Sequence, residues 1–183
     1  MVGGSHGGFG GSQSDIKFGE IGSCYGSVKK PVTQGSGGRK INDNLSGGSG
    51  GAAMKIKATV SMTLDGTISM DGTEGGECVN RGCQSAGAGS GGSVWIDAAT
   101  FSGTGTITSD GGKSTRGYPY YSPHDYINYD GGGGGGGRIA IYCTTKTFSG
   151  TLSSSGGTLG EKFNLATMNV ADQTTRNWYS SST

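Results

Sequence analysis

The feature that most constrains this chain is a pattern of two short apolar runs that occurs three times. In each copy a glycine-rich stretch leads into an alternating apolar run, and a polar link then leads into Gly-Thr-aliphatic-Ser/Thr. The equivalent glycines are Gly66, Gly105 and Gly150, at spacings of 39 and 45 residues. Internal repeats with periods of this size are typical of stacked repeat architectures, in which each copy contacts its neighbours.

Apolar and polar residues alternate along the first run of each copy, so that one side of an extended chain would be apolar. This period of two predicts β-strands, and Gly and Pro interrupt every stretch that could form a helix of three turns. The residues expected on the apolar side are Met54, Ile56 and Ala58, then Val94, Ile96 and Ala98, then Ile139, Ile141 and Cys143. The second runs add Leu64, Ile68 and Met70, then Phe101 and Ile107, then Phe148 and Leu152. The sequence therefore predicts an all-β fold.

A single pair of short strands cannot bury its apolar side alone, so the copies must share one core. We predict a parallel β-helix or β-solenoid, in which each strand pairs with its equivalent in the next copy and the glycine-rich stretches form the corners. The same alternation is compatible with an antiparallel β-sandwich, which remains the alternative.

Charge and composition limit the classes of partner. Gly supplies 41 of the 183 residues, but with 14 basic and 13 acidic residues the net charge is only +1, so charge repulsion does not favour disorder. No basic stripe indicates nucleic-acid binding, and no run of 18 apolar residues indicates membrane insertion. We expect neither partner.

The chain is predicted to form one domain over residues 1–183. Residues 1–45 are a glycine-rich N-terminal coil, and residues 46–160 hold the three β-repeats. Residues 161–183 lose the regular glycines and carry several large apolar side chains, which indicates a C-terminal cap or docking segment.

The four cysteines point to an oxidising compartment. Cys78 and Cys83 lie close together in a glycine-flanked segment that suits a disulfide, and Cys24 and Cys143 are the remaining candidates, with the connectivity left open. Asn44 begins an Asn-Leu-Ser tripeptide, which is an acceptor sequence for N-glycosylation. Both features favour an extracellular or cell-surface location.

Several segments also carry a family resemblance. The segments at residues 3–11, 24–38 and 131–141, in this order around the three strand pairs, resemble the glycine-rich β-helix-like repeat segments of large secreted and cell-surface proteins of plants, protists and bacteria. The resemblance covers most of residues 3–157. It implies an extracellular β-helix-like scaffold without catalytic residues that could be carried over.

Glycine-rich motifs that resemble phosphate-binding loops do not have the context that such loops need. Residues 87–92 formally match G-x-G-x-x-G but precede a strand, and no helix is expected after the Gly-Gly-Lys-Ser-Thr of residues 111–115. The seven glycines at residues 131–137, beside Arg138, could cradle an anion, but a tight corner or an extended polyglycine layer is the interpretation we favour.

Carboxylates are the other candidates for chemistry. Asp65, Asp71, Asp97 and Asp110 would suit a polysaccharide-acting β-helix enzyme, which needs two carboxyl groups about 5–10 Å apart. Asp71 and Asp110 occupy equivalent turn positions, so turn capping or a bound calcium ion explains them equally well. His6 and His124 lack a second ligand at a useful spacing, so no other metal or cofactor is expected, and we expect no enzyme.

The segment between the second and third copies is the most distinctive candidate surface, because it contains five tyrosines and two prolines. Tyrosines offer rigid amphipathic rings that contact proteins or stack on sugars, although the same segment could pack on its own sheet. The candidate contact residues are Tyr118, Tyr120, Tyr121, Tyr126 and Tyr129, together with Trp178.

These features favour an extracellular structural protein that self-assembles into a filament or surface layer by stacking its β-repeats. The expected partner is another copy of the chain, because open strand edges accept further strands. One alternative is an adhesin or glycan-binding module that uses the tyrosine-rich segment to contact surface glycans or matrix proteins. The other alternative is the polysaccharide-acting enzyme.

Overall fold

The computed structural model describes residues 2–11, 22–42, 44–78, 83–117, 120–122, 125–127, 130–158 and 178–179. Within these residues there are nine strands and no helix. The strands are β1 (Ala53–Thr63), β2 (Thr67–Ser69), β3 (Ser93–Gly103), β4 (Thr106–Thr108), β5 (Tyr120–Ser122), β6 (Asp125–Ile127), β7 (Arg138–Phe148), β8 (Thr151–Ser153) and β9 (Trp178–Tyr179). The all-β prediction is confirmed.

Each copy of the repeat forms one long strand and one short strand joined by a tight bend. The long strands β1, β3 and β7 pair in parallel, in the order β1-β3-β7, and the short strands pair in parallel in the order β2-β4-β8. Equivalent residues lie side by side, as Ile56, Ile96 and Ile141 do. This parallel pairing of the repeats excludes the antiparallel sandwich for them.

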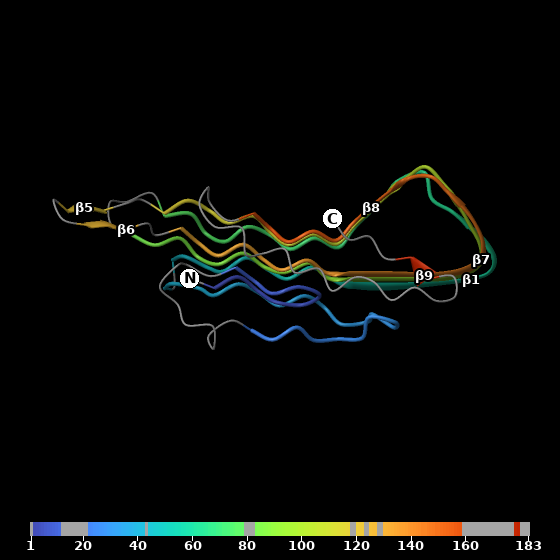
Figure 1. The fold of residues 1–183 in the computed structure, drawn as a ribbon, viewed down its shortest axis with the longest axis horizontal. Coiled ribbons are helices and arrows are strands. Elements are labelled where there is room, and N and C mark those ends of the chain that lie inside the picture. Colours follow the sequence, from blue (N-terminus) through green and yellow to red (C-terminus); the bar gives the residue numbers. More distant parts are fainter. Residues whose placement is uncertain are drawn as a thin grey trace.

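The apolar core lies between the long and the short strands, which form the two sides of the bend in Figure 1. The rings of Phe101 and Phe148, from the second and third copies, stack with centroids 4.6 Å apart. The buried members of the core are Val94, Ile96, Phe101, Ile107, Ile139, Ile141, Cys143 and Phe148. The corresponding residues of the first copy, among them Ile56 and Ile68, are only partly buried. The core is thus enclosed at the second copy and, apart from the partly buried Leu152, at the third, and it is open at the first.

The glycine-rich stretches are extended segments that pack against one another, and they form the wavy ribbons of Figure 1. Residues 85–93, which we call the central segment, donate backbone hydrogen bonds to three different neighbours in turn. Ala86, Gly87 and Ala88 bond to the carbonyls of Gly76, Arg39 and Gly132, and Gly89, Ser90 and Gly91 repeat the cycle with Thr73, Ser36 and Gly135. The direction of the backbone N–H groups thus repeats every three residues, which is the geometry of a polyproline II-type chain.

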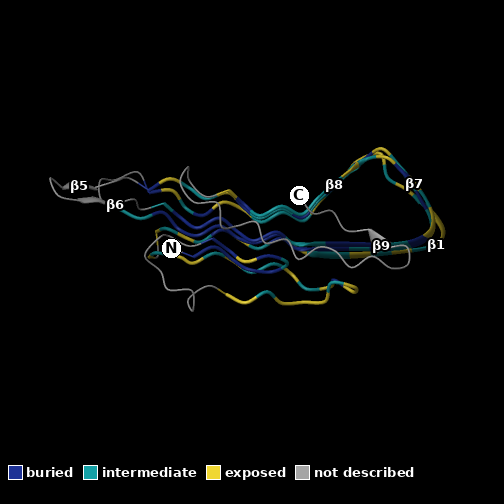
Figure 2. Ribbon diagram, in the orientation of Figure 1, coloured by how far each residue is buried: buried dark blue, intermediate teal, exposed yellow. Residues whose placement is uncertain are grey.

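Six segments surround the central segment, and each forms backbone hydrogen bonds both to it and to the next segment around the ring. In order around the ring they are residues 70–76, 108–115, 131–137, 2–11, 35–39 and 46–52. Residues 153–158 add one more segment outside 108–115 and 131–137. We call these eight segments the glycine bundle. Figure 2 shows that its middle is buried.

Glycine is required in the bundle because backbones approach closely. A Cβ atom built on Gly89 would overlap the Ser49 carbonyl, and one built on Gly134 would overlap the Gly89 carbonyl. The expectation that the glycine-rich stretches form corners is therefore wrong for most of them. Among the described glycines only Gly26 and Gly103 have a positive φ, of 82° and 114°. For residues 131–137 the extended polyglycine layer is the interpretation that holds.

Bundle and sheets are stacked in the same order, because each long strand follows one bundle segment and each short strand leads into another. Residues 46–52 and 70–76 flank the first copy, residues 85–93 and 108–115 the second, and residues 131–137 and 153–158 the third. Residues 2–11 and 35–39, from the stretch expected to be a coil, complete the ring below the central segment. The glycine-rich sequence thus forms a second packed body that continues the stack of strands.

Candidate functional site

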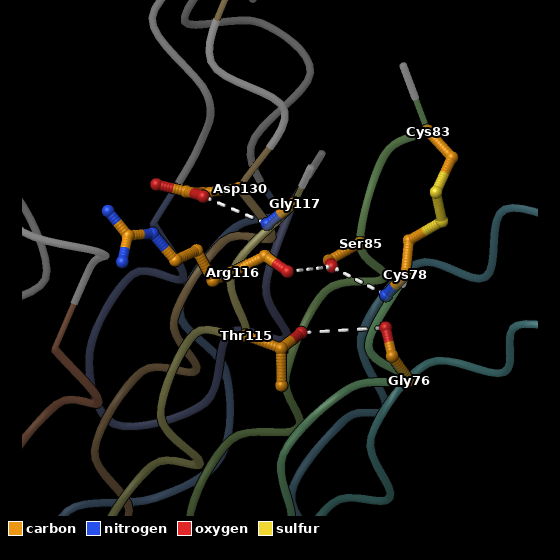
Figure 3. Close-up of a disulfide and its surroundings, with 8 residues drawn as sticks. All are labelled: Gly76, Cys78, Cys83, Ser85, Thr115, Arg116, Gly117 and Asp130. Carbon is orange, nitrogen blue, oxygen red and sulfur yellow. Dashed lines mark hydrogen bonds between the residues drawn. A yellow bond between two sulfur atoms is a disulfide. The ribbon is translucent and has the colours of Figure 1, made fainter. Parts of the chain in front are cut away.

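One disulfide closes the end of the bundle. Cys78 and Cys83 are bonded, with their Cα atoms 5.9 Å apart, as predicted. Figure 3 shows that Ser85 links the disulfide-bonded segment to Arg116. The Cys78 N–H donates to Ser85 Oγ (3.0 Å), and the Ser85 hydroxyl donates to the Arg116 carbonyl (2.7 Å). Cys24 and Cys143 are free thiols, and burial raises the pKa of both. The disulfide therefore ties the segment that leaves the first copy to the one that enters the second.

The turn aspartates join successive copies. Asp71 Oδ1 accepts the Asp110 N–H (2.6 Å), and its Oδ2 accepts the Thr108 hydroxyl (2.7 Å). In the same way Asp110 Oδ1 accepts the N–H of Ser155 (2.6 Å). Each carboxylate thus caps the backbone of the following copy, which supports turn capping as the role of these residues.

Asp65 and Asp97 lie elsewhere in the stack. Asp65 Oδ1 accepts the N–H of Thr104 at 3.0 Å, again from one copy to the next. Asp97 lies on the face of β3 that points away from the core, between Lys57 and Tyr142 of the adjacent strands. Within the described residues no three His, Cys, Asp or Glu side chains gather as a metal site would require. The calcium ion and the enzyme remain untested.

The glycine motifs that resemble phosphate-binding loops use their backbone amides for hydrogen bonds within the bundle. Residues 87–92 lie inside the bundle, where their amides donate to backbone carbonyls. Four of the amides in residues 131–137 likewise donate to the carbonyls of residues 4, 109, 112 and 115. Residues 111–115 run on as a bundle segment, with no helix after them. These amides are unavailable for a phosphate.

His6 has a structural role that sequence reasoning missed, because it was considered only as a metal ligand. Its ring is fully buried, with Nδ1 2.8 Å from the Gly91 carbonyl and Nε2 2.9 Å from Thr33 Oγ1. The carbonyl can only accept, so Nδ1 carries the proton and Nε2 accepts from the threonine hydroxyl. Burial, with a smaller contribution from the Arg138 charge, lowers the pKa of His6. The isolated histidine gives no sequence signal for this role.

A shallow depression of about 530 Å³ crosses the outer face of the long strands. It is lined by three residues from each of β1, β3 and β7, including the row Lys57, Asp97 and Tyr142. The Tyr142 hydroxyl donates to the Lys29 carbonyl at 2.6 Å, which fixes its ring. Beside it the Lys55 ammonium lies 3.7 Å from the centroid of the Trp95 ring. These contacts engage the Tyr142 hydroxyl and the face of the Trp95 ring, while the buried Trp95 Nε1 has no hydrogen-bond partner among the described residues.

The tyrosine-rich segment contains the hairpin of β5 and β6, in which Tyr121 pairs with Tyr126 and Tyr120 with Ile127. In Figure 1 it lies at the opposite end of the molecule from the bend of the long strands. Tyr118 and Tyr129 lie outside the described residues. The contact roles of the five tyrosines and of Trp178, in β9, stay predictions. Asn44 is exposed beside a turn, as a glycosylation site requires, and its modification also stays a prediction.

The open edge of β1 is the strongest candidate for an interaction site. β1 is the last strand of its sheet, and β2 is the last of the other. The Ser93 N–H bonds to the Ala52 carbonyl, so the alternating backbone groups of Ala53, Lys55 and Lys57 point away from β3. No described strand pairs with them.

Half-exposed core residues accompany this unpaired edge. The inward-facing residues of the first copy are only partly buried, whereas their apolar equivalents in the second copy, and in the third copy with the exception of Leu152, are buried. Val60, at the bulge where the register of β1 shifts, is 73% exposed. The first copy therefore presents both unpaired backbone and apolar side chains at one end of the stack.

The other end of the stack is different. β9 pairs antiparallel with the free edge of β7, where Tyr179 lies opposite Ile141 and Trp178 opposite Tyr142. Ile139 and Ile141 of β7 are as deeply buried as Val94 and Ile96 of β3. The two ends of the stack are thus an open end at β1 and an occupied end at β7.

The described part of the chain has no helix long and apolar enough to cross a membrane. No protein family model, curated protein or solved structure matches this chain.

Proposed function

We propose that this chain is an extracellular structural protein that assembles by stacking its β-repeats end to end. The observation that carries the proposal is the open end at β1, where no described strand pairs with the outer side of this 11-residue strand and the core residues of the first copy are half exposed. Unpaired edges of this kind are templates for further strands unless they are covered. The disulfide favours a location outside the cell.

The most favourable incoming strand is β7 of another copy, because it would continue the pairing already present. In the register of the three repeats, the incoming Ile141 would lie beside Ile56 and the incoming Tyr142 beside Lys57. Ala140 would lie beside Lys55, so neither lysine would face another cation across the junction. Like charges directly opposite each other destabilise a sheet, and this arrangement avoids them.

Stacking of this kind joins two different surfaces, the β7 end of one molecule and the β1 end of the next molecule. Head-to-tail contacts that do not close into a ring produce open filaments. The stability of such an array is close to the sum of the stabilities of its units and of the interfaces between them. Each added molecule would therefore bury the half-exposed first repeat of the molecule before it. The proposed product is therefore a filament or a layer of filaments.

The test uses a proline at the open edge. Lys57 is exposed and its N–H points away from β3, so Lys57→Pro removes a donor from the open side without removing a bond to β3. Sedimentation velocity and negative-stain microscopy over a range of concentrations should show assembly by the chain and by Lys57→Ala, and none by Lys57→Pro. Monomers at every concentration, in both the unmodified chain and the variant with a disrupted β9 described below, would contradict the proposal.

A further inference from the structure

The edge of β7 that head-to-tail stacking requires is the edge on which β9 lies. We infer that β9 is an intramolecular cap, which must leave β7 before β1 of another copy can pair there. The inference rests on the proposed function, because it concerns the regulation of the same junction. It assigns a role in controlling assembly to the C-terminal strand.

The pairing of β9 differs from that of the repeats in direction and in length. β9 is antiparallel to β7, whereas all neighbouring repeat strands are parallel. It pairs through two residue pairs, compared with nine between β1 and β3 and ten between β3 and β7. A fourth copy would continue the parallel ladder, so β9 is a different kind of partner, one that covers the edge without extending the stack.

The position of β9 makes it a direct competitor. It lies on Ile141 and Tyr142, the residues that would otherwise pair with Ile56 and Lys57 of an incoming copy. Both strands need the same backbone groups of β7, so they cannot be bound together. An incoming β1 can form several more residue pairs than β9 does, so stacking should displace the cap once the concentration of the chain is high enough.

The turn aspartates Asp71 and Asp110 indicate that the junction between two molecules is weaker than the contacts between successive repeats of one molecule. Asp71 caps the second copy and Asp110 caps the third, but the equivalent position in the third copy is Ser155. The first repeat of an incoming molecule would therefore meet the Ser155 hydroxyl where the junctions between repeats have a carboxylate. Hydrogen bonds to charged acceptors are stronger than those to neutral ones. A weaker junction is one that a two-residue cap can hold closed at low concentration.

The experiment weakens the backbone pairing of β9 in the full-length chain. Trp178→Pro with Tyr179→Pro removes both backbone N–H groups of the strand, of which that of Tyr179 faces Ile141, and Trp178→Val with Tyr179→Val is the matched control that keeps them. We expect the proline variant to assemble at a concentration about tenfold lower than the unmodified chain and the valine control, the effect of losing about one net hydrogen-bonded pair. Sedimentation velocity measures the threshold, and far-UV circular dichroism verifies folding.

The outcomes separate the two proposals. Equal assembly thresholds in all three proteins would overturn the cap while leaving the stacking function standing. Assembly by the valine control at the same low threshold as the proline variant would assign the effect to the rings and would also overturn the cap as stated. Monomers in all three proteins would overturn the stacking function itself. Adding Lys57→Pro to the proline variant should abolish its assembly, because the incoming edge is then blocked.

As a second readout, amide hydrogen exchange at Ile141, whose N–H points away from β3 toward β9, should become faster in the proline variant when it is held below its assembly threshold, whereas exchange at Tyr142, whose N–H points toward β3, should not change. At concentrations above the threshold the protection should return, because β1 of another copy replaces β9. Unchanged exchange at Ile141 below the threshold would contradict the inference independently of any assembly assay.

Discussion

Replacing Gly89 with alanine should destabilise the protein far more than the same change at Gly66. Gly89 lies in the central segment, and its added Cβ would overlap the Ser49 carbonyl and the backbone of Gly50. At Gly66, which is in the bend of the first copy, a Cβ would meet no atom within 4 Å. The two substitutions are chemically identical, so their difference isolates the close packing of the bundle.

The loss in the free energy of unfolding can be worked out from the segment that must move in Gly89→Ala. To admit the methyl group, residues 46–52 must shift away from the central segment, which strains the bonds from Gly48 N–H to Gly87 and from Gly51 N–H to Ser90, of 2.9 and 2.8 Å. Overpacking costs about 1–3 kcal/mol and each net hydrogen bond about 1 kcal/mol, so the expected loss is about 3–5 kcal/mol. For a chain of this size that lowers the melting temperature by about 6–20 °C.

Thermal and urea denaturation followed by circular dichroism would measure both variants. Gly66→Ala should change the free energy of unfolding by less than about 0.5 kcal/mol. Ala86 and Ala88 show that some positions in the central segment admit a methyl group, so the expectation concerns the crowded position and not glycine content in general. Equal melting temperatures for the two variants would refute the packed-bundle reasoning.

Three further predictions concern other contacts. Asp71→Ala removes the acceptor of three hydrogen bonds, from Ser69, Thr108 and Asp110, and should lower the free energy of unfolding by about 1–3 kcal/mol in urea titrations, whereas Asp97→Ala should have little effect. Because burial lowers the pKa of His6 below 6.5, the unfolded chain binds the proton more readily, so stability should fall as the pH falls below 6.5; His6→Gln should reduce that slope, and an unchanged slope would contradict the assignment. Replacing Cys78 and Cys83 with serine should cost about 2 kcal/mol for so short a loop, measured by thermal denaturation against the oxidised parent.

The strands and their register could be predicted from the sequence because the apolar alternation is repeated three times. Ile56, Ile96 and Ile141 occur at equivalent places in the three copies, and the structure pairs them side by side. The disulfide between Cys78 and Cys83 was also predictable, because the two residues are close in sequence and flanked by glycine. Local patterns of this kind carry information about neighbours in the same strand or loop.

The glycine bundle could not be predicted in the same way. A run such as residues 131–137 has no side chains to show which direction it faces, so its sequence suits a corner and a packed layer equally well. One signal was present in residues 46–52, where Ser46, Ser49 and Ala52 recur every third residue and are exposed while glycines fill the positions between. That period of three is the polyproline II repeat.

The open end of the stack depends on tertiary structure and was only partly predictable. Open strand edges were expected together with a cap or docking segment in residues 161–183, and of those residues the structure describes β9, which pairs with the edge of β7. His6 was missed for a related reason: its partners Thr33 and Gly91 lie 27 and 85 residues away in sequence. Contacts between distant segments leave no periodic trace in a single sequence.

Amide hydrogen exchange measured by NMR tests the packed glycine bundle most directly. If the central segment is enclosed by six hydrogen-bonded neighbours, the amides of residues 86–92 should exchange as slowly as those of β3, and those of Gly134, Gly135 and Gly137 should be similarly protected. The exposed residues Ser46 and Thr158 should exchange faster. Exchange of the central-segment amides at the rate of an unstructured glycine peptide, with β3 still protected, would contradict the bundle and with it the continuous stack on which the proposed assembly depends.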